Sequence, residues 1–194
     1  MTKEDRSQDC FEVQGIRLCV VNLSATYSLN RELDLEALSS DLPNSEYNPE
    51  QYSSLILRVP EGTFLIPRSG KITLVGIKSE GDIEYSFERF IDTLQELGIS
   101  CELEPDRIDL QNIVVQGEFE GDLDLSPLAI GLGFEKVEYE PEQFPGLVYR
   151  DQNGVVLFFA SGKFIITGVS EFNQIEDVAN RIYRELESLG IEVN

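Results

Sequence analysis

Apolar and polar residues follow the same order in the two halves of the chain, and this order predicts the same elements twice. Each half begins with an apolar, β-rich run, at residues 16–23 and 108–115. A short helical stretch follows, at residues 34–42 and 125–132. Several short strands come next, separated by turn signals that contain glycine. The pattern therefore predicts hairpin-linked, antiparallel strands in each half.

Each half closes with apolar residues that recur at steps of three and four, which predicts a long amphipathic helix. The apolar face consists of Ile83, Phe87, Phe90, Ile91, Leu94 and Leu97 in the first half, and of Ile175, Val178, Ala179, Ile182, Leu186 and Leu189 in the second. Gly98 and Gly190 are suited to end these helices. We expect the helices to cover one face of the sheet, so that the other face determines the function.

The similarity of the two halves extends to an ungapped internal repeat. Residues 47–78 read YNPEQYSSLILRVPEGTFLIPRSGKITLVGIK, and residues 139–170 read YEPEQFPGLVYRDQNGVVLFFASGKFIITGVS. Two copies are too few for an open solenoid, which needs more units to bury a core. We therefore predict one fused, pseudo-twofold molecule, with a first repeat at residues 1–99, including a short N-terminal tail, and a second repeat at residues 100–194.

Composition argues against several classes of function. Hydrophobic residues make up 41% of the 194 residues, enough for a buried core, and histidine is absent. Without the commonest general base and metal ligand, and without a nucleophile or phosphate-loop motif, we expect no enzyme, no metal site and no cofactor. The cysteines, Cys10, Cys19 and Cys101, are odd in number and not closely paired. This spacing argues against a disulfide framework and against a zinc site.

The charge is strongly negative, with 15 basic and 36 acidic residues and a net charge of −21. Taken alone, this charge argues against nucleic-acid binding, because DNA-binding surfaces are normally basic. The acidic residues are spread along the chain rather than gathered in a tail. The polar first ten residues lack the apolar stretch of a secretion signal, and no run is long enough to span a membrane. We expect a cytoplasmic protein.

The repeated motifs resemble the signatures of the TATA-box-binding protein family, in particular its archaeal members. The segments YEPEQFPGLVYR and LFFASGKFIITG resemble the second-repeat signature, and YNPEQY, RSGK and VGIKSE resemble the first. Asn22 and Asn112 fall where the family has its paired asparagines. The resemblance covers nearly the whole chain from about Leu18. It implies an α+β fold of two tandem repeats, in which a saddle-shaped antiparallel sheet carries helices on its convex face and lies on the DNA minor groove.

In the second repeat the resemblance implies a complete set of DNA contacts. Asn112 would contact the central bases of the site. Phe144 and Phe159 would be wedges that partially unstack base steps. The remaining implied contacts are the groove-floor residues Val114, Ile165 and Thr167 and the phosphate-binding residues Arg150 and Lys163.

The first repeat departs from the family pattern. Asn22, Arg58 and Lys71 remain, whereas the two wedge positions hold Tyr52 and Pro67. Proline cannot stack into a base step as phenylalanine does. The other changed positions are the groove-floor residues Ser24, Thr73 and Val75, and Glu50 and Gln51 where the family is often basic; Arg68 could restore a phosphate contact. This half is thus weakened for standard TATA recognition.

The resemblance implies a general or alternative archaeal transcription initiation factor that binds A/T-rich promoter DNA in the minor groove and bends it. It also implies recruitment of transcription factor B through the stretch Tyr139–Gln143, in which Glu140, Glu142 and Gln143 are candidate contacts, and of RNA polymerase indirectly. Such a protein would be associated with the nucleoid. The alternative is a divergent paralogue of the same fold that acts mainly through protein–protein interaction. Halophilic members of the family are similarly acidic, so we expect DNA binding that is weak at low salt and persists or improves at high salt.

Overall fold

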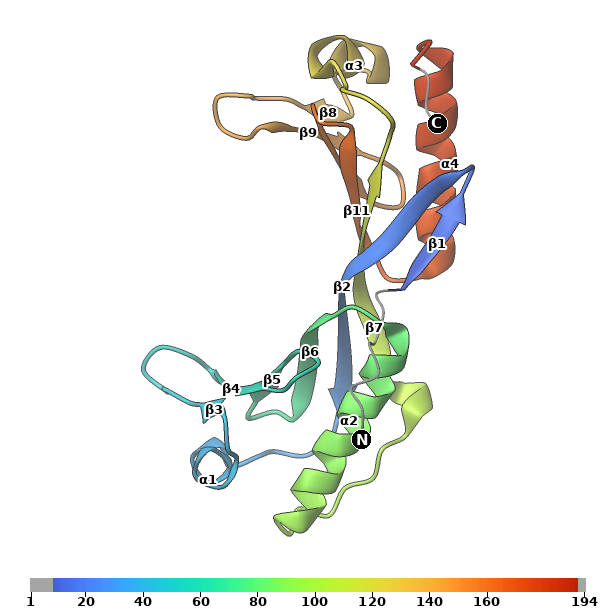
Figure 1. Cartoon of the computed structure of the whole chain (residues 1–194). Coiled ribbons are helices and arrows are strands. Elements are labelled where there is room, and N and C mark those ends of the chain that lie inside the picture. The colour runs from blue at the N-terminus through green and yellow to red at the C-terminus, as the bar shows by residue number, and fades with distance from the viewer. Residues whose placement is uncertain (1–8, 192–194) are drawn as a thin grey trace. The chain divides into compact units, whose positions relative to one another are not determined.

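The computed structural model describes residues 9–191, which divide into two compact units (Figure 1). The first unit contains Asn22–Gln111, and the second contains residues 9–21 together with residues 112–191. The division falls inside β2 (Ile16–Ser28) and β7 (Asp109–Glu118), so each of these strands contributes to both units. The boundary between the repeats at residues 99 and 100 was drawn from the sequence repeat and stays a prediction. Residues 1–8, where the first repeat was predicted to have a short N-terminal tail, and residues 192–194 lie outside the described part of the chain.

The first unit contains one antiparallel sheet with the strand order β3-β4-β5-β6-β2. Its other strands are β3 (Ser45–Glu46), β4 (Ser54–Arg58), β5 (Thr63–Pro67) and β6 (Lys71–Ile77). The helices are α1 (Leu35–Asp41) and α2 (Glu80–Glu96), and a 3-10 turn, η1 (Pro105–Arg107), precedes β7. Asp34 caps α1, because its side chain accepts hydrogen bonds from the N–H groups of Glu36 and Ala37.

The second unit repeats this arrangement with the strand order β7-β11-β10-β9-β8. Its strands are β8 (Val137–Glu138), β9 (Gly146–Arg150), β10 (Val155–Phe159) and β11 (Lys163–Val169), and its helices are α3 (Leu125–Leu132) and α4 (Phe172–Ser188). One further strand, β1 (Cys10–Val13), forms a hairpin with the start of β2. The prediction of an α+β fold with antiparallel sheets is confirmed.

In each unit the long helix covers one face of the sheet, as the amphipathic pattern predicts (Figure 1). Residues on that face are fully buried, among them Ile72 and Leu74 of β6 and Phe87 and Leu94 of α2. Leu97 and Leu189 differ from the prediction. They follow the last helical turn and are 37% and 39% exposed. No helix within residues 9–191 combines the length and apolar character that crossing a bilayer requires.

The long helices end at the predicted glycines. The N–H of Gly98 donates to the carbonyl of Gln95, and the N–H of Ile99 donates to that of Leu94, both at 2.9 Å. Gly190 and Ile191 make the equivalent bonds at the end of α4. This pattern satisfies carbonyl groups that the helix itself leaves unpaired.

The expectation of no disulfide is wrong. Cys10 and Cys19 form a disulfide across the β1–β2 hairpin, with their Cα atoms 4.1 Å apart. The hairpin turns at Gln14 and Gly15, whose φ angles are 53° and 81°. Such a two-residue turn sets the strand register and so places the cysteines opposite each other. The sequence pattern did not indicate β1, and so the pairing was missed. Cys101 is free.

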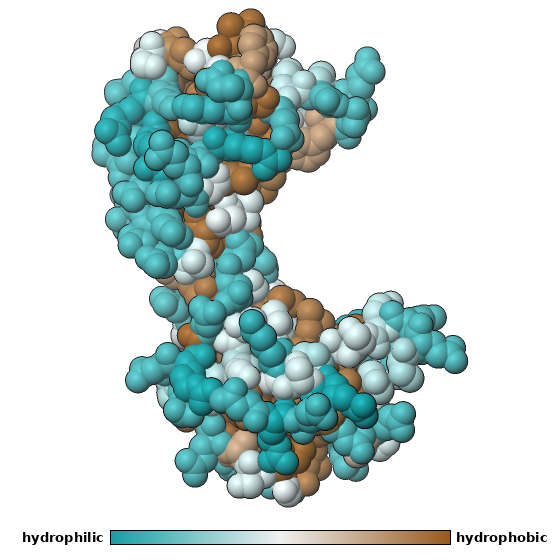
Figure 2. Space-filling view, turned by 180° about the vertical axis from the view of Figure 1, so that it is seen from behind, coloured by the Kyte–Doolittle hydropathy of each residue, from teal (hydrophilic) through white to brown (hydrophobic). Residues whose placement is uncertain are grey.

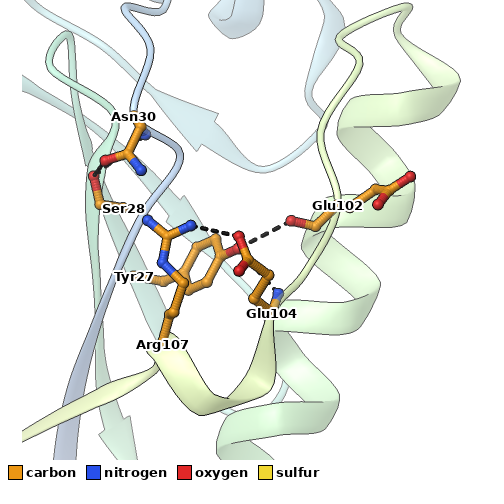
Figure 3. A network of polar contacts seen from close by, with 6 residues as sticks. All are labelled: Tyr27, Ser28, Asn30, Glu102, Glu104 and Arg107. Carbon is orange, nitrogen blue, oxygen red and sulfur yellow. Dashed lines mark hydrogen bonds and ion pairs between the residues drawn. The ribbon is translucent and has the colours of Figure 1, made fainter.

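The segment between α2 and β7 is fastened to β2 by a polar network around Tyr27 (Figure 3). The Tyr27 hydroxyl donates to the carbonyl of Glu102 at 2.9 Å and accepts from the N–H of Glu104 at 3.1 Å. The Arg107 guanidinium lies 5.9 Å from the centre of the Tyr27 ring and pairs with the Glu104 carboxylate. This network sets the path along which the chain enters β7.

Candidate nucleic-acid interface

The sheet of the first unit has one face that none of the described helices covers, and most predicted DNA-binding residues of the first repeat lie on it. Alternation along each strand directs these side chains to the same face, where they are half-buried or exposed. Ser24 lies opposite Val75, which in turn lies opposite Thr63. The face carries the predicted residues Asn22, Ser24, Arg58, Lys71, Thr73 and Val75.

The second unit has an equivalent uncovered face. It carries the predicted residues Asn112, Val114, Arg150, Phe159, Lys163, Ile165 and Thr167. Leu157 lies between Ile165 and Val148 on the same face, and Gln116 lies opposite Ile165. Leu157, Val148 and Gln116 were not predicted from the sequence as DNA contacts. Their position follows from the alternation of each strand once the register is known.

An asparagine on each face is held in one orientation by a glycine. The Gly76 N–H donates to Oδ1 of Asn22, and the Gly168 N–H donates to Oδ1 of Asn112, both at 3.0 Å. Both glycines have positive φ angles, 86° and 78°, next to irregularities in the strand pairing. Because each side-chain oxygen accepts this bond, the amide NH2 is turned away from the glycine as a donor. One N–H of Asn112 lies 3.4 Å from the Thr167 hydroxyl oxygen, which leaves the other N–H to donate to a ligand. A donor here suits the minor groove, whose A·T pairs present only acceptor atoms.

The wedge positions differ between the units. The rings of Phe144 and Phe159 meet edge to face, with centroids 6.0 Å apart, and Phe144 is 38% exposed. In the first unit Tyr52 is 48% exposed, and Pro67 lies at the end of β5, opposite Ser54. No ring contact joins Tyr52 to another aromatic side chain within residues 9–191. Among the described residues, the second unit alone thus has two contacting rings at its wedge positions, of which Phe144 is exposed and Phe159 is half-buried.

The two arginines predicted to reach phosphates are already paired with carboxylates. Arg58 lies 3.3 Å from Glu46, and Arg150 lies 3.0 Å from Glu138. All four side chains are more than half exposed. The glutamates were missed in the sequence, although their matching places in the repeat could have revealed them. A phosphate would have to compete with each carboxylate for the guanidinium. Lys71, Lys163 and Arg68 are exposed.

The predicted partner-binding residues lie in the exposed loop between β8 and β9. Glu140, Glu142 and Gln143 are all exposed. The loop is ordered by its own bonds, since the Phe144 N–H donates to the carbonyl of Glu140 at 3.0 Å and the Gln143 side-chain amide donates to the Glu140 carboxylate. The loop therefore leads directly into the exposed Phe144.

A family model and individual relatives of known identity match this chain and point to the same family. The family model described as "Transcription factor TFIID (or TATA-binding protein, TBP)" matches residues 17–97 and 107–189. The chain belongs to this family. The TATA-box-binding protein E of Halobacterium salinarum is 44% identical over 176 residues, which are 89% of this chain and 94% of that protein. The TATA-box-binding protein of Archaeoglobus fulgidus is 40% identical over 183 residues, which are 92% of this chain and 100% of that protein.

The fold is likewise that of the TATA-box-binding protein family. The solved structure of the TATA-box-binding protein of Methanococcus jannaschii is similar to this chain with a TM-score of 0.80 and 35% sequence identity. The match covers 88% of this chain and 98% of that chain. These relatives are named for binding the TATA box, not for a catalysed reaction. The family resemblance seen in the sequence motifs is therefore confirmed.

Proposed function

We propose that the protein is a TATA-box-binding initiation factor of archaeal transcription, either general or alternative, that binds A/T-rich promoter DNA in the minor groove and bends it. The observation that carries the proposal is the fixed orientation of Asn22 and Asn112. Each presents an amide donor on an uncovered sheet face, where the minor groove would offer acceptors. Membership of the family supports the same function.

The other contacts follow from the uncovered faces. The groove floor would pack on Ser24, Thr73, Val75, Val114, Ile165 and Thr167, which are half-buried. Phe144 and Phe159 would open a base step, and Tyr52 would do so less effectively because of its hydroxyl. Arg58, Lys71, Arg150 and Lys163 would bind phosphates, which position the protein without reading sequence.

The proposed partners are transcription factor B and, through it, RNA polymerase. Glu140, Glu142 and Gln143 form an exposed, acidic loop beside Phe144, and such a loop suits a basic surface on the partner. We propose that the protein acts without catalysis, in the cytoplasm, at chromosomal DNA.

The test is fluorescence anisotropy with a labelled TATA duplex and a scrambled duplex across a potassium chloride series, with and without transcription factor B. We expect the wild-type protein to prefer the TATA duplex. The variant with Asn22→Ala and Asn112→Ala should lose this preference, because it lacks both amide donors. Asn173→Ala, an exposed change on α4, is the matched control and should bind as the wild type does.

The divergent first unit favours a second candidate function, a paralogue that acts mainly through protein–protein interaction. Pro67 occupies a wedge position there, and Glu50 and Gln51 replace residues that are often basic in the family. A protein that is folded by circular dichroism but binds neither duplex at any salt concentration, even with transcription factor B, would support this candidate and overturn the first.

A further inference from the structure

Two apolar side chains of the second unit are more exposed than any other large hydrophobic side chain in the described part of the chain. Ile130 is 66% exposed and Phe134 is 73% exposed. Leu189, which is 39% exposed, packs against Gly131, the residue after Ile130. Figure 2 shows apolar surface over the α3 end of this unit. We call Ile130, Phe134 and Leu189 the α3–α4 patch. Exposed apolar clusters of this kind mark interaction sites more often than isolated exposed residues do.

The fold does not need apolar residues at these positions. In the first unit α1 corresponds to α3, with the buried residues Leu35 and Leu38 matching Leu125 and Leu128. Counted at the same offset as these leucines, the residues that correspond to Ile130 and Phe134 are Ser40 and Asn44, and both are polar and exposed. The connection to the next strand is also longer in the second unit, at residues 133–136 compared with residues 42–44. The exposed apolar pair is therefore a feature of the second unit that the shared fold does not require.

The patch joins two elements in close contact. A Cβ atom added at Gly131 would lie 2.5 Å from Cδ2 of Leu189, so the Leu189 side chain packs directly on the backbone of α3. Glycine at this position permits that approach. The packing of α3 against the end of α4 thus holds Leu189 against the turn of α3 that carries Ile130.

The surroundings of the patch are electronegative. Both α3 and α4 end there, and neither has a basic residue in its last turn. The carbonyl ends of helices carry partial negative charge. The Glu135 carboxylate lies over Gly133, within 2.9 Å of where a Cβ would be, and Glu187 is exposed in the last turn of α4. Lys136 is paired with Glu185 at 3.8 Å. A ligand at the patch would therefore meet an apolar centre with an anionic rim.

We propose that the α3–α4 patch is a docking site for a partner protein that presents an apolar side chain flanked by Lys or Arg on an amphipathic helix. Charge complementarity selects this occupant. A second copy of this chain, with a net charge of −21, would bring like charge to an anionic rim. The patch lies off the uncovered sheet faces, so the proposal does not depend on DNA binding.

The first experiment measures binding of a labelled helical peptide that carries Leu on one face and Lys on both flanks, at a fixed, high potassium chloride concentration. We expect the variant with Ile130→Ser and Phe134→Asn, which takes the residues of the first unit, to bind at least roughly tenfold more weakly, because a few anchor residues carry most of the binding energy of such interfaces. Leu97→Ser removes the corresponding exposed leucine of the first unit and should change nothing.

Two further peptides test the chemistry. Replacing the Leu residues by Ser, or the Lys residues by Glu, should each abolish binding. Equal affinity of wild type and the double variant would overturn the proposal, because the peptide would then be attracted by the general acidity of the protein. If the wild type bound the Glu peptide as tightly as the Lys peptide, the positive charge assigned to the partner would be overturned. TATA-duplex binding by the double variant should match the wild type, so failure here is distinguishable from failure of the proposed function.

A second measurement places the peptide on the patch directly. The chain has no tryptophan, so Phe134→Trp introduces a single fluorescent reporter at a position that is 73% exposed. We expect its emission to shift to shorter wavelength when the Leu and Lys peptide docks. Unchanged emission at saturating peptide would overturn the proposal. Analytical ultracentrifugation tests whether a second copy of this chain occupies the patch instead. Dimerisation of the wild type that the double variant abolishes would assign the patch to a second copy and contradict the proposal.

Discussion

Asp151 and Arg181 show how a single pair of residues distinguishes the two units. Arg181 of α4 donates two hydrogen bonds, of 2.9 and 2.6 Å, to the Asp151 carboxylate in the β9–β10 connection. The Asp151 side chain is only 4% exposed. Its burial would raise its pKa, but the hydrogen bonds from Arg181 and from the backbone of Asn153 outweigh burial and lower the pKa below its usual value. The first unit has Val59 in place of Asp151, and so it cannot form this pair.

We expect Arg181→Met to lower the free energy of unfolding by about 3 kcal/mol at pH 7, because it leaves a buried carboxylate without its partner. In the wild type the lowered pKa contributes stability above the pKa of the unfolded state, and this contribution disappears as pH falls through the folded pKa. In the variant, burial raises the Asp151 pKa, so protonation stabilises the folded state. The deficit should therefore shrink as pH falls from 7 towards about 4, where the variant recovers stability, and shrink further below about pH 4, where the wild type loses its contribution.

Urea unfolding of both proteins at constant potassium chloride, between pH 7 and pH 3, measures this deficit. Arg184→Met is the control, because Arg184 is exposed on the same helix and, within residues 9–191, its guanidinium bonds only to the Asn180 carbonyl. A deficit that is independent of pH would show that Arg181 stabilises the unit by packing rather than by its charge.

A second prediction at the residue scale concerns Asn112. Asn112→Asp keeps the shape and the acceptor for the Gly168 N–H but replaces the amide donor by a charged oxygen. We expect affinity for the TATA duplex to fall by more than roughly tenfold, because the carboxylate would face the acceptor atoms of the minor groove. Anisotropy measures the loss, and Asn173→Asp on α4 controls for the added charge. Equal losses in both variants would argue for a general charge effect.

At the scale of elements, the two units differ in the wedge residues at the ends of β5 and β10. β10 ends in Phe159, which contacts Phe144, whereas β5 ends in Pro67 and offers no second aromatic ring to Tyr52. The surrounding strands keep the same register in both units, since Phe159 lies opposite Gly146 and Pro67 lies opposite Ser54. The inequality therefore resides in side chains and not in the backbone.

We expect Phe159→Ala to reduce the bend of a TATA duplex, measured by energy transfer between dyes at the two ends, because a wedge that unstacks a base step is lost. Pro67→Phe should increase the bend and the affinity, because it supplies the missing ring at the first unit. If Pro67→Phe had no effect while Phe159→Ala abolished bending, bending would depend on the second unit alone.

At the scale of the whole molecule, net charge competes with the local contacts. The chain carries a net charge of −21, and Arg58 and Arg150 are each paired with a glutamate that a phosphate must displace. Dissolved salt screens the long-range repulsion between the acidic protein and DNA, with a Debye length of about 3 Å at 1 M. The short-range contacts of the sheet faces depend less on salt. The usual loss of affinity with added salt should therefore be absent.

We expect affinity for the TATA duplex to be low in dilute buffer and to hold or increase as potassium chloride is raised. Glu46→Gln together with Glu138→Gln should make the slope of log affinity against log salt concentration more negative by roughly one unit for each arginine freed to bind a phosphate. Anisotropy across the salt series measures both slopes. A steep loss of affinity in the wild-type protein would contradict the role assigned to the net charge.

The sequence by itself determined the repeat, the type and order of most elements, the family and the faces on which the predicted residues lie, because these depend on local periodicity and on motifs that occur twice. Tertiary structure decided what depends on contacts between distant positions. It joined residues 9–21 to the second unit, formed the Cys10–Cys19 disulfide across a turn that the pattern did not indicate, and paired Arg58 and Arg150 with glutamates on neighbouring strands. It also oriented the two asparagines through the backbone of Gly76 and Gly168 and brought Leu189 onto α3. The residue types permit each of these contacts, but only strand register and helix packing bring the atoms within reach.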